Sequence, residues 1–166
     1  TVIAGIGQGF VLTTPIQLAV MAARIGNGRK AIKAKLLSDE AKNSDEFQPL
    51  NISGTVLKEI QLSMRSVVAG GRGTARKYDL DGYGMAGKTG TVQVKRISKA
   101  ERDEGVIDNI DRRWKDRDHA LFVAYAPYKK PKYAISVIVE HGGSGSSMAA
   151  PIARDILKFA LDRQSI

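Results

Sequence analysis

The stretch of sequence that decides the fold reads Met85-Ala86-Gly87-Lys88-Thr89-Gly90-Thr91-Val92-Gln93-Val94. Its β-branched residues and the alternation at its end predict a β-strand. Lys88 and Thr89 also complete the pattern G-x-x-x-x-G-K-[ST], which begins at Gly82 and is found in loops that cradle phosphates. That loop requires a buried strand before it and a helix after it, whereas Gly90 and the β-branched residues behind it oppose a helix. A nucleotide-binding loop at Gly82–Thr89 is therefore a remote alternative to the strand.

The apolar pattern on both sides of this strand predicts the remaining elements. Spacings of three and four indicate helices and alternation indicates strands: helices at 14–25, 56–68 and 149–160, and strands at 121–126 and 133–139. The short link between the last two strands predicts that they pair antiparallel. One further short strand is expected at 31–37. The order helix, helix, three strands, helix predicts an α+β fold with helices packed against an antiparallel sheet.

Between the first two of these three strands lies a charged excursion, residues 95–118. It contains eight Lys or Arg, seven Asp or Glu, and Trp114 as its only large aromatic side chain. Charges of both signs mixed this closely predict a solvent-exposed segment with salt bridges, part of it helical. Its aspartates lack the Gly and the closing Glu of a calcium-binding loop, so we expect no metal there.

The composition of the 166 residues fits one folded domain and excludes several classes of protein. The chain is 43% apolar and 26% charged, with no Cys, so disulfides and thiolate chemistry are excluded. No apolar run is long enough to span a membrane. His119 and His141 have no second ligand at metal-binding spacing, and we expect neither a metal nor a cofactor. The net charge of +9 favours an anionic partner, but ten aromatic residues and no recognition module argue against nucleic acid.

Five stretches together carry a family resemblance. In chain order they are Gly5-Ile6-Gly7-Gln8-Gly9, Thr14-Pro15-Ile16-Gln17-Leu18-Ala19, Gly73-Thr74-Ala75, Ala86 to Val94, and Ala124-Tyr125-Ala126-Pro127. They resemble the carboxy-terminal part of class B penicillin-binding proteins, and are most similar to the penicillin-binding protein 2 group, the D,D-transpeptidases of cell elongation. The resemblance spans residues 4–161. It implies an incomplete penicillin-binding or serine β-lactamase-like transpeptidase domain, with three of the family's five strands present.

The resemblance implies a role for each residue of the K-T-G-T sequence. Lys88 would be the basic group of the family's third motif. The hydroxyls of Thr89 and Thr91 would bind the terminal carboxylate of the substrate or of a β-lactam. The backbone N–H of Thr91 would be one of two oxyanion-hole donors, and Gly90 would keep the strand thin beside the substrate. Lys88 and Thr91 are thus the expected catalytic residues, and Thr89, Gly90 and Thr91 the expected substrate-binding residues.

The family's nucleophile is not found in this sequence. Family members use a Ser followed three residues later by Lys, and a second S-x-N element, and no Ser here has either pattern. We therefore expect residues 1–166 to be the carboxy-terminal fragment of one transpeptidase domain. Residues 1–75 would form a helical part with Gly-rich turns, and residues 76–166 the K-T-G strand, the excursion, two strands and the last helix. The serine, a pedestal region and a membrane anchor would lie upstream.

By resemblance, the parent protein would cross-link peptidoglycan during elongation, at the periplasmic face of the bacterial inner membrane. Its expected partners are peptidoglycan stem peptides, β-lactams, the upstream part of the same domain and membrane proteins of the elongation complex. The residues leave one alternative open, a non-catalytic binding module of a cell-envelope protein in which residues 95–118 dock a partner.

We also expect the chain to self-associate. By resemblance, the strand at 133–140 would lie beside an upstream strand that this sequence does not contain, which would leave a bare edge. The helix that would cover one face of the sheet would be missing as well, exposing apolar side chains between Leu121 and Val139.

Overall fold

The computed structural model describes residues 2–5, 11–36, 47–95 and 97–163, and a three-stranded antiparallel sheet lies at its centre. The strands are ordered β1 (Ala86–Val92), β2 (His119–Ala126) and β3 (Tyr133–Val139). Lys88 lies opposite Val123, and Ala124 opposite Ile135. The predicted α+β class and the antiparallel pairing are confirmed.

The other elements surround this sheet. They are α1 (Val2–Gly5), α2 (Pro15–Asn27), α4 (Gly54–Ala69), η2 (Arg76–Tyr78), α5 (Lys99–Asp103), η3 (Asn109–Asp111), η4 (Trp114–Asp116), η5 (Gly145–Ala149) and α6 (Ala150–Asp162). Helices α2, α4 and α6 are the three predicted ones, with boundaries that differ from the prediction by a few residues.

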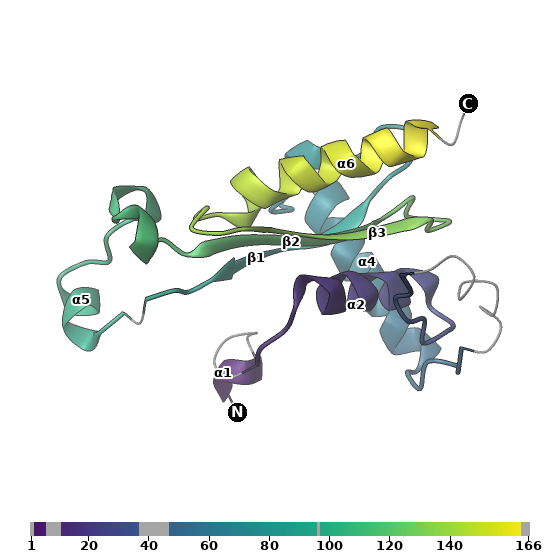
Figure 1. Cartoon of the computed structure of the whole chain (residues 1–166), viewed down its shortest axis with the longest axis horizontal. Helices are drawn as coiled ribbons and strands as arrows, with labels where there is room; N and C mark the ends of the chain where they lie inside the picture. Colours follow the sequence, from purple (N-terminus) through teal and green to yellow (C-terminus); the bar gives the residue numbers. More distant parts are fainter. Residues whose placement is uncertain (1, 6–10, 37–46, 96, 164–166) are drawn as a thin grey trace.

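Both faces of the sheet are covered by helices (Figure 1). On one face, Leu157 and Leu161 of α6 pack around Phe122. On the other face, Tyr125 packs against Met64 of α4 and neighbouring residues of α2. Because β2 is the central strand, its last five residues are all buried, as its continuous apolar sequence predicts.

Helix α2 begins and ends where its sequence predicts. The Thr14 side chain accepts a hydrogen bond from the N–H of Gln17, and the Gln17 side chain accepts one from the N–H of Thr14. Pro15 occupies the first turn. Gly28 ends the helix in a left-handed conformation, with φ of 68°. Gly26 lies directly on Tyr125, because a Cβ built there would be 2.9 Å from the ring. The absence of a side chain at Gly26 therefore brings α2 close to the sheet.

Two expectations are corrected by the structure. The segment 31–36 forms no strand, because its pairing is limited to one bridge between Lys30 and Pro49; residue 37 lies outside the described residues. Nor is one sheet face stripped of its helix. Helix α2 covers it, so β2 is buried, although β3 is only partly buried and Ile138 stays 38% exposed. The Gly-rich turn expected at 5–9 falls mostly outside the described residues.

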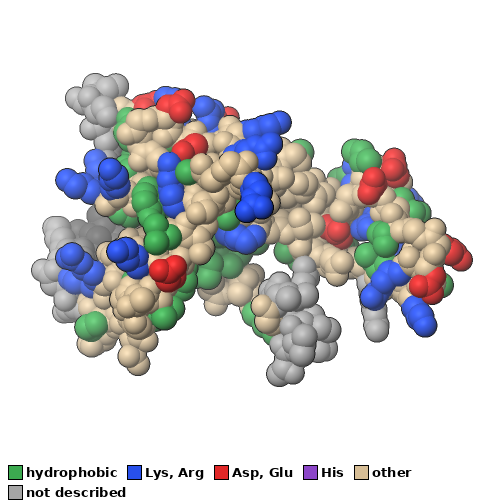
Figure 2. Space-filling model, turned by 180° about the vertical axis from the view of Figure 1, so that it is seen from behind, with side chains coloured by type: hydrophobic (Ala, Val, Ile, Leu, Met, Phe, Trp, Pro, Cys, Tyr) green, Lys and Arg blue, Asp and Glu red, His purple; other side chains and the backbone are tan. Residues whose placement is uncertain are grey.

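Residues 95 and 97–118 form a charged lobe that extends beyond the end of the sheet (Figures 1 and 2). It contains α5 and two short 3-10 helices, and pairs such as Lys95–Glu101 and Arg113–Asp116 confirm the predicted salt bridges. At its base the carboxylate of Asp118 is only 5% exposed and accepts hydrogen bonds from the Asn109 side chain and the Val94 N–H. This buried acid, which the charge pattern did not distinguish from its neighbours, fixes the lobe to the sheet.

An ion pair links α4 to the start of β1. Arg65 donates two hydrogen bonds of 2.7 Å to the two carboxylate oxygens of Asp79, and one of 2.6 Å to the carbonyl of Met85. Asp79 in turn accepts from the N–H groups of Leu80 and Met85. Burial raises the pKa of Asp79, but its hydrogen bonds to Arg65, Leu80 and Met85 outweigh burial, and its pKa lies below the ordinary value.

This ion pair predicts how stability depends on pH. Because the pKa of Asp79 is lower in the folded state, the pair contributes fully above the unfolded value near 3.8 and is lost as the pH falls through the folded pKa. Asp79→Asn should lower the free energy of unfolding at neutral pH by about 2 kcal/mol and should flatten its decline in acid. Urea titrations followed by circular dichroism at several pH values measure both effects.

The matched control is Asp155→Asn, which removes an exposed pair with Arg154. It should change the stability by less than about 0.5 kcal/mol. An Asp79→Asn protein with the stability and acid response of the unaltered protein would refute the role given to this pair.

The open edge of β3 predicts self-association of the 166-residue chain. Among the described residues β3 pairs only with β2, so its other edge presents unpaired backbone groups. Sedimentation over a concentration series should show a mass that rises with concentration, and the charge introduced by Ile138→Lys should reduce the rise. A monomer of constant mass over the whole series would contradict this prediction.

Candidate functional site

The K-T-G-T sequence lies on an outer strand. Among the described residues β1 pairs only with β2, so the opposite edge of β1 is open. Lys88 and Thr91 are exposed, while Thr89 and Gly90 are partly buried. Side chains alternate along a strand, so Lys88 lies on the face of α4 and the two threonines on the face of α6. The four residues therefore share one edge but not one face.

The backbone of β1 is accessible from this edge. The Lys88 ammonium group donates a hydrogen bond of 2.7 Å to the carbonyl of Thr89, which places that carbonyl on the open side. Residues two apart direct their backbone groups to the same side of an antiparallel strand. We therefore infer that the N–H and C=O groups of Thr91 lie along the same edge.

Glycines keep this part of the sheet thin. A Cβ at Gly87 would lie 2.6 Å from the Phe122 ring, and one at Gly90 would lie 3.2 Å from the Leu121 side chain. A Cβ at Gly145, in η5, would collide with the carbonyls of Gly90 and Leu121. Close packing at these three positions thus fixes the height of β1 relative to its neighbours.

A loop behind α4 reaches the same edge. The chain leaves α4 at Gly70 and turns back, with the Ala75 N–H donating to the carbonyl of Val67 at 3.0 Å. The loop contacts β1 through two hydroxyl groups, since Thr74 Oγ1 lies 2.9 Å from Thr89 Oγ1. Gly73-Thr74-Ala75 belongs to the family resemblance, but no role for Thr74 could be read from the sequence, since its partner Thr89 is fifteen residues away and meets it only after folding.

Two grooves meet at Lys88. One, of about 440 Å³, lies between the end of α4, the loop and β1, and its charged lining residues are Arg72 and Lys88. The other, of about 460 Å³, follows α4 and is mainly apolar, with Ile60, Met64 and Val67 among its lining residues. A cation between a polar and an apolar groove suits a ligand with a carboxylate and an aliphatic portion.

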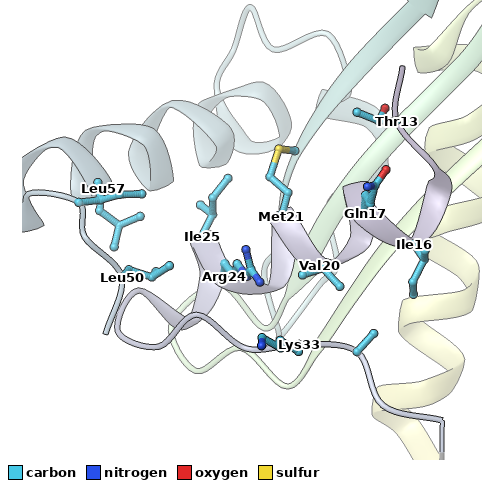
Figure 3. A pocket seen from close by; sticks show the side chains of 12 residues that line it. Thr13, Ile16, Gln17, Val20, Met21, Arg24, Ile25, Lys33, Leu50 and Leu57 are labelled. Atoms are coloured by element: carbon cyan, nitrogen blue, oxygen red, sulfur yellow. The ribbon is translucent and has the colours of Figure 1, made fainter. Parts of the chain in front are cut away.

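A larger hollow lies elsewhere, between α2 and the segments 33–34 and 50–57 (Figure 3). It measures about 700 Å³, and side chains of Ile16, Val20 and Met21 line it. Arg24 lies at the wall of this hollow, and its Nε–H donates a hydrogen bond of 2.8 Å to the carbonyl of Ile32. Its aliphatic lining offers a packing surface, and its size alone does not make it a centre of chemistry.

The structure also rules on the two weaker candidates. Thr89 is followed by more strand, so the Gly82–Thr89 segment lacks the helix that a phosphate-binding loop requires, and the nucleotide alternative is excluded. The two histidines contact each other, as the His141 N–H donates to His119 Nδ1 at 2.9 Å. Within the described residues no three His, Cys, Asp or Glu side chains are placed to hold a metal ion.

Known proteins share this arrangement. The family model described as the penicillin binding protein transpeptidase domain matches residues 1–158. The peptidoglycan D,D-transpeptidase MrdA of Salmonella typhimurium strain SL1344 is 34% identical over 175 residues, covering 99% of this chain and 27% of the relative. MrdA of Haemophilus influenzae is 35% identical, covering 99% of this chain and 26% of the relative.

Two solved structures are also similar. PBP2 of Pseudomonas aeruginosa, in complex with WCK 5153, is 32% identical with a TM-score of 0.63, covering 93% of this chain and 31% of that chain. PBP2 of Helicobacter pylori, in complex with MreC, is 28% identical with a TM-score of 0.74, covering 98% of this chain and 27% of that chain. The chain thus spans about a quarter of the length of the curated relatives, and it belongs to the penicillin-binding protein transpeptidase domain family, with PBP2 proteins among its relatives.

Proposed function

We propose that this chain forms one wall of the active site of a peptidoglycan D,D-transpeptidase that cross-links the cell wall during elongation. The observation that carries the proposal is the open edge of β1, where Lys88, Thr89 and Thr91 stand beside two grooves. Membership of the family and the names of the curated relatives support the reaction class. The relatives are about four times longer, so the rest of the site would come from chain beyond these residues.

In the proposed reaction a serine outside this chain attacks the carbonyl of a stem peptide. The carbonyl oxygen becomes negatively charged in the tetrahedral intermediate, and the Thr91 N–H would donate to it. The peptide bond to the terminal D-alanine then breaks and the D-alanine leaves as an amine, which gains a proton. An amine from a neighbouring strand attacks the acyl-enzyme, and the serine is released. A β-lactam would acylate the same serine.

Each residue of the edge has a role that its position supports. Lys88 would lie next to the serine and would stabilise negative charge and ease proton transfer there; its present bond to Thr89 shows that its ammonium group reaches the edge. The hydroxyls of Thr89 and Thr91 would donate to the carboxylate of the substrate. Gly90 would let the substrate lie close to the strand.

The open surfaces of the chain support the proposed partners. The outer edge of β3 would receive a strand from the upstream part of the same domain, and the aliphatic hollow beside α2 a helix from it. No helix in the described part of the chain is long and apolar enough to cross a membrane. We propose an upstream anchor and a periplasmic location. A membrane partner of elongation is a further proposal, supported by the MreC complex of the Helicobacter pylori relative.

A docking role is the second candidate, and one observation favours it. The charged lobe exposes apolar side chains, with Ile107 at 64%, Ile110 at 73% and Trp114 at 63% exposure. In this alternative the protein would be a non-catalytic binding module, and the K-T-G strand would be structural. The two functions are separated by the serine, since only the transpeptidase requires an upstream S-x-x-K element.

The first test uses the chain alone. Because it contains no S-x-x-K serine, incubation with a labelled penicillin should produce no covalent adduct, and intact-mass spectrometry measures this directly. A stoichiometric acyl group on any serine of the 166 residues would refute the proposed division of the site.

The second test uses the intact enzyme that contains this chain. Lys88→Ala should lower the second-order rate constant of acylation by about a hundredfold or more, because the charge next to the serine is lost. The control Arg29→Ala removes an equally exposed cation just after α2 and should leave the rate within about twofold. An unchanged rate in the Lys88 variant would overturn the assignment of the edge as the active-site wall.

A further inference from the structure

The contact between the hydroxyls of Thr74 and Thr89 gives the loop behind α4 a role in substrate binding. We propose that Thr74 is a positioning residue, which turns the hydroxyl proton of Thr89 toward the carboxylate of the stem peptide. The inference rests on the proposed function and adds a residue to it that lies outside the K-T-G-T sequence. It concerns selectivity for a carboxylate rather than the acylation chemistry itself.

Hydroxyl groups and carboxylates differ in their capacity to form hydrogen bonds. A hydroxyl has one proton to donate and two lone pairs that accept, whereas a carboxylate only accepts. In the 2.9 Å contact either oxygen can be the donor. If Thr89 gives its proton to Thr74, it presents only lone pairs to a carboxylate, and these repel it. If Thr74 donates, the Thr89 proton is available for the substrate. A bound carboxylate therefore selects the second arrangement, in which Thr74 fills a lone pair of Thr89.

The position of Thr74 is fixed before any substrate arrives. Ala75, its neighbour, is fully buried and donates its N–H to the carbonyl of Val67. On the other side, a Cβ at Gly73 would lie 2.6 Å from the carbonyl of Ser66, so the loop is packed tightly on the end of α4. Helix α4 itself packs on β1. The backbone of Thr74 is thus held in place by its neighbours, and the exposed side chain needs to settle only its own rotamer to act on Thr89.

The charges around the pair favour an anion. Arg72 and Lys88 line the 440 Å³ groove together with Thr74, and no lining residue is acidic. Two cations in a groove without acids attract a carboxylate and disfavour a neutral or cationic group. The loop therefore contributes to the anion site twice, through the charge of Arg72 and through the hydroxyl of Thr74.

The test compares two ligands on the intact enzyme. Thr74→Val keeps the shape of the side chain but removes its hydroxyl. Acylation rate constants are measured with benzylpenicillin, which carries a carboxylate, and with its methyl ester, which does not. The ratio of the two constants should fall about tenfold in Thr74→Val and should return to within about twofold in Thr74→Ser. Both constants come from the same preparation, so a loss of folded protein cancels in the ratio.

Ser53→Ala removes an exposed hydroxyl just before α4, one that makes no capping hydrogen bond to the helix, and should leave the ratio unaltered. A ratio in Thr74→Val equal to that of the unaltered enzyme would overturn the inference, as would a Thr74→Ser variant no better than Thr74→Val. The Lys88→Ala measurement distinguishes a failure of the inference about Thr74 from a failure of the proposed function. If Lys88→Ala abolishes acylation while the Thr74→Val ratio is unchanged, the inference about Thr74 fails and the proposed function stands.

Discussion

The ion pair between Arg65 and Asp79 determines where β1 begins, and the geometry of the candidate site depends on it. Arg65 donates to the carboxylate of Asp79 and to the carbonyl of Met85, while Asp79 accepts from the N–H groups of Leu80 and Met85. Helix and strand are thus joined by charged hydrogen bonds, which are shorter and stronger than neutral ones. A shift of this junction would move Lys88 and the Thr74 loop together, because both are attached to α4 and β1.

The two open edges of the sheet differ in a way that fits different partners. Beside β1 lie a lysine, two threonines and grooves of about 440 and 460 Å³. The side chains of β3 are mostly aliphatic and partly buried apart from the exposed Ile138, with Tyr133 at its start and the Ser136 hydroxyl within it. A strand edge with donors and a cation suits an extended anionic peptide, whereas an aliphatic edge suits another strand of the same protein. In the proposed function, peptide recognition and domain completion would therefore use opposite sides of one small sheet.

Local sequence predicted the fold where local chemistry decides it. Thr14, Pro15 and Gln17 form the expected capping box, and the uninterrupted apolar run of β2 is buried as expected. No strand forms at 31–36, because a strand needs a neighbouring strand to pair with and the structure supplies only the bridge at Lys30. The burial of Asp118 could not be predicted from composition. The mixed charges of residues 95–118 predict an exposed segment as a whole and do not distinguish the one acid that is buried.

The candidate site was predictable in part. The K-T-G-T residues could be placed on a strand from their own sequence, and the resemblance supplied their expected roles. Thr74 could not be connected to Thr89 in this way, because the contact depends on how the Gly70–Ala75 loop packs on α4. A tertiary contact of this kind leaves no periodic pattern in the sequence from which it could be predicted.

The central claim, that the open edge of β1 binds the carboxylate of the substrate, is tested most directly by a crystal structure of the intact enzyme acylated by benzylpenicillin. The account predicts the acyl group on a serine outside this chain, and the penicillin carboxylate within hydrogen-bond distance of the Thr89 and Thr91 hydroxyls. It also predicts the Thr74 hydroxyl still bonded to Thr89. A carboxylate bound away from β1, with solvent along the Lys88–Thr91 edge, would contradict it.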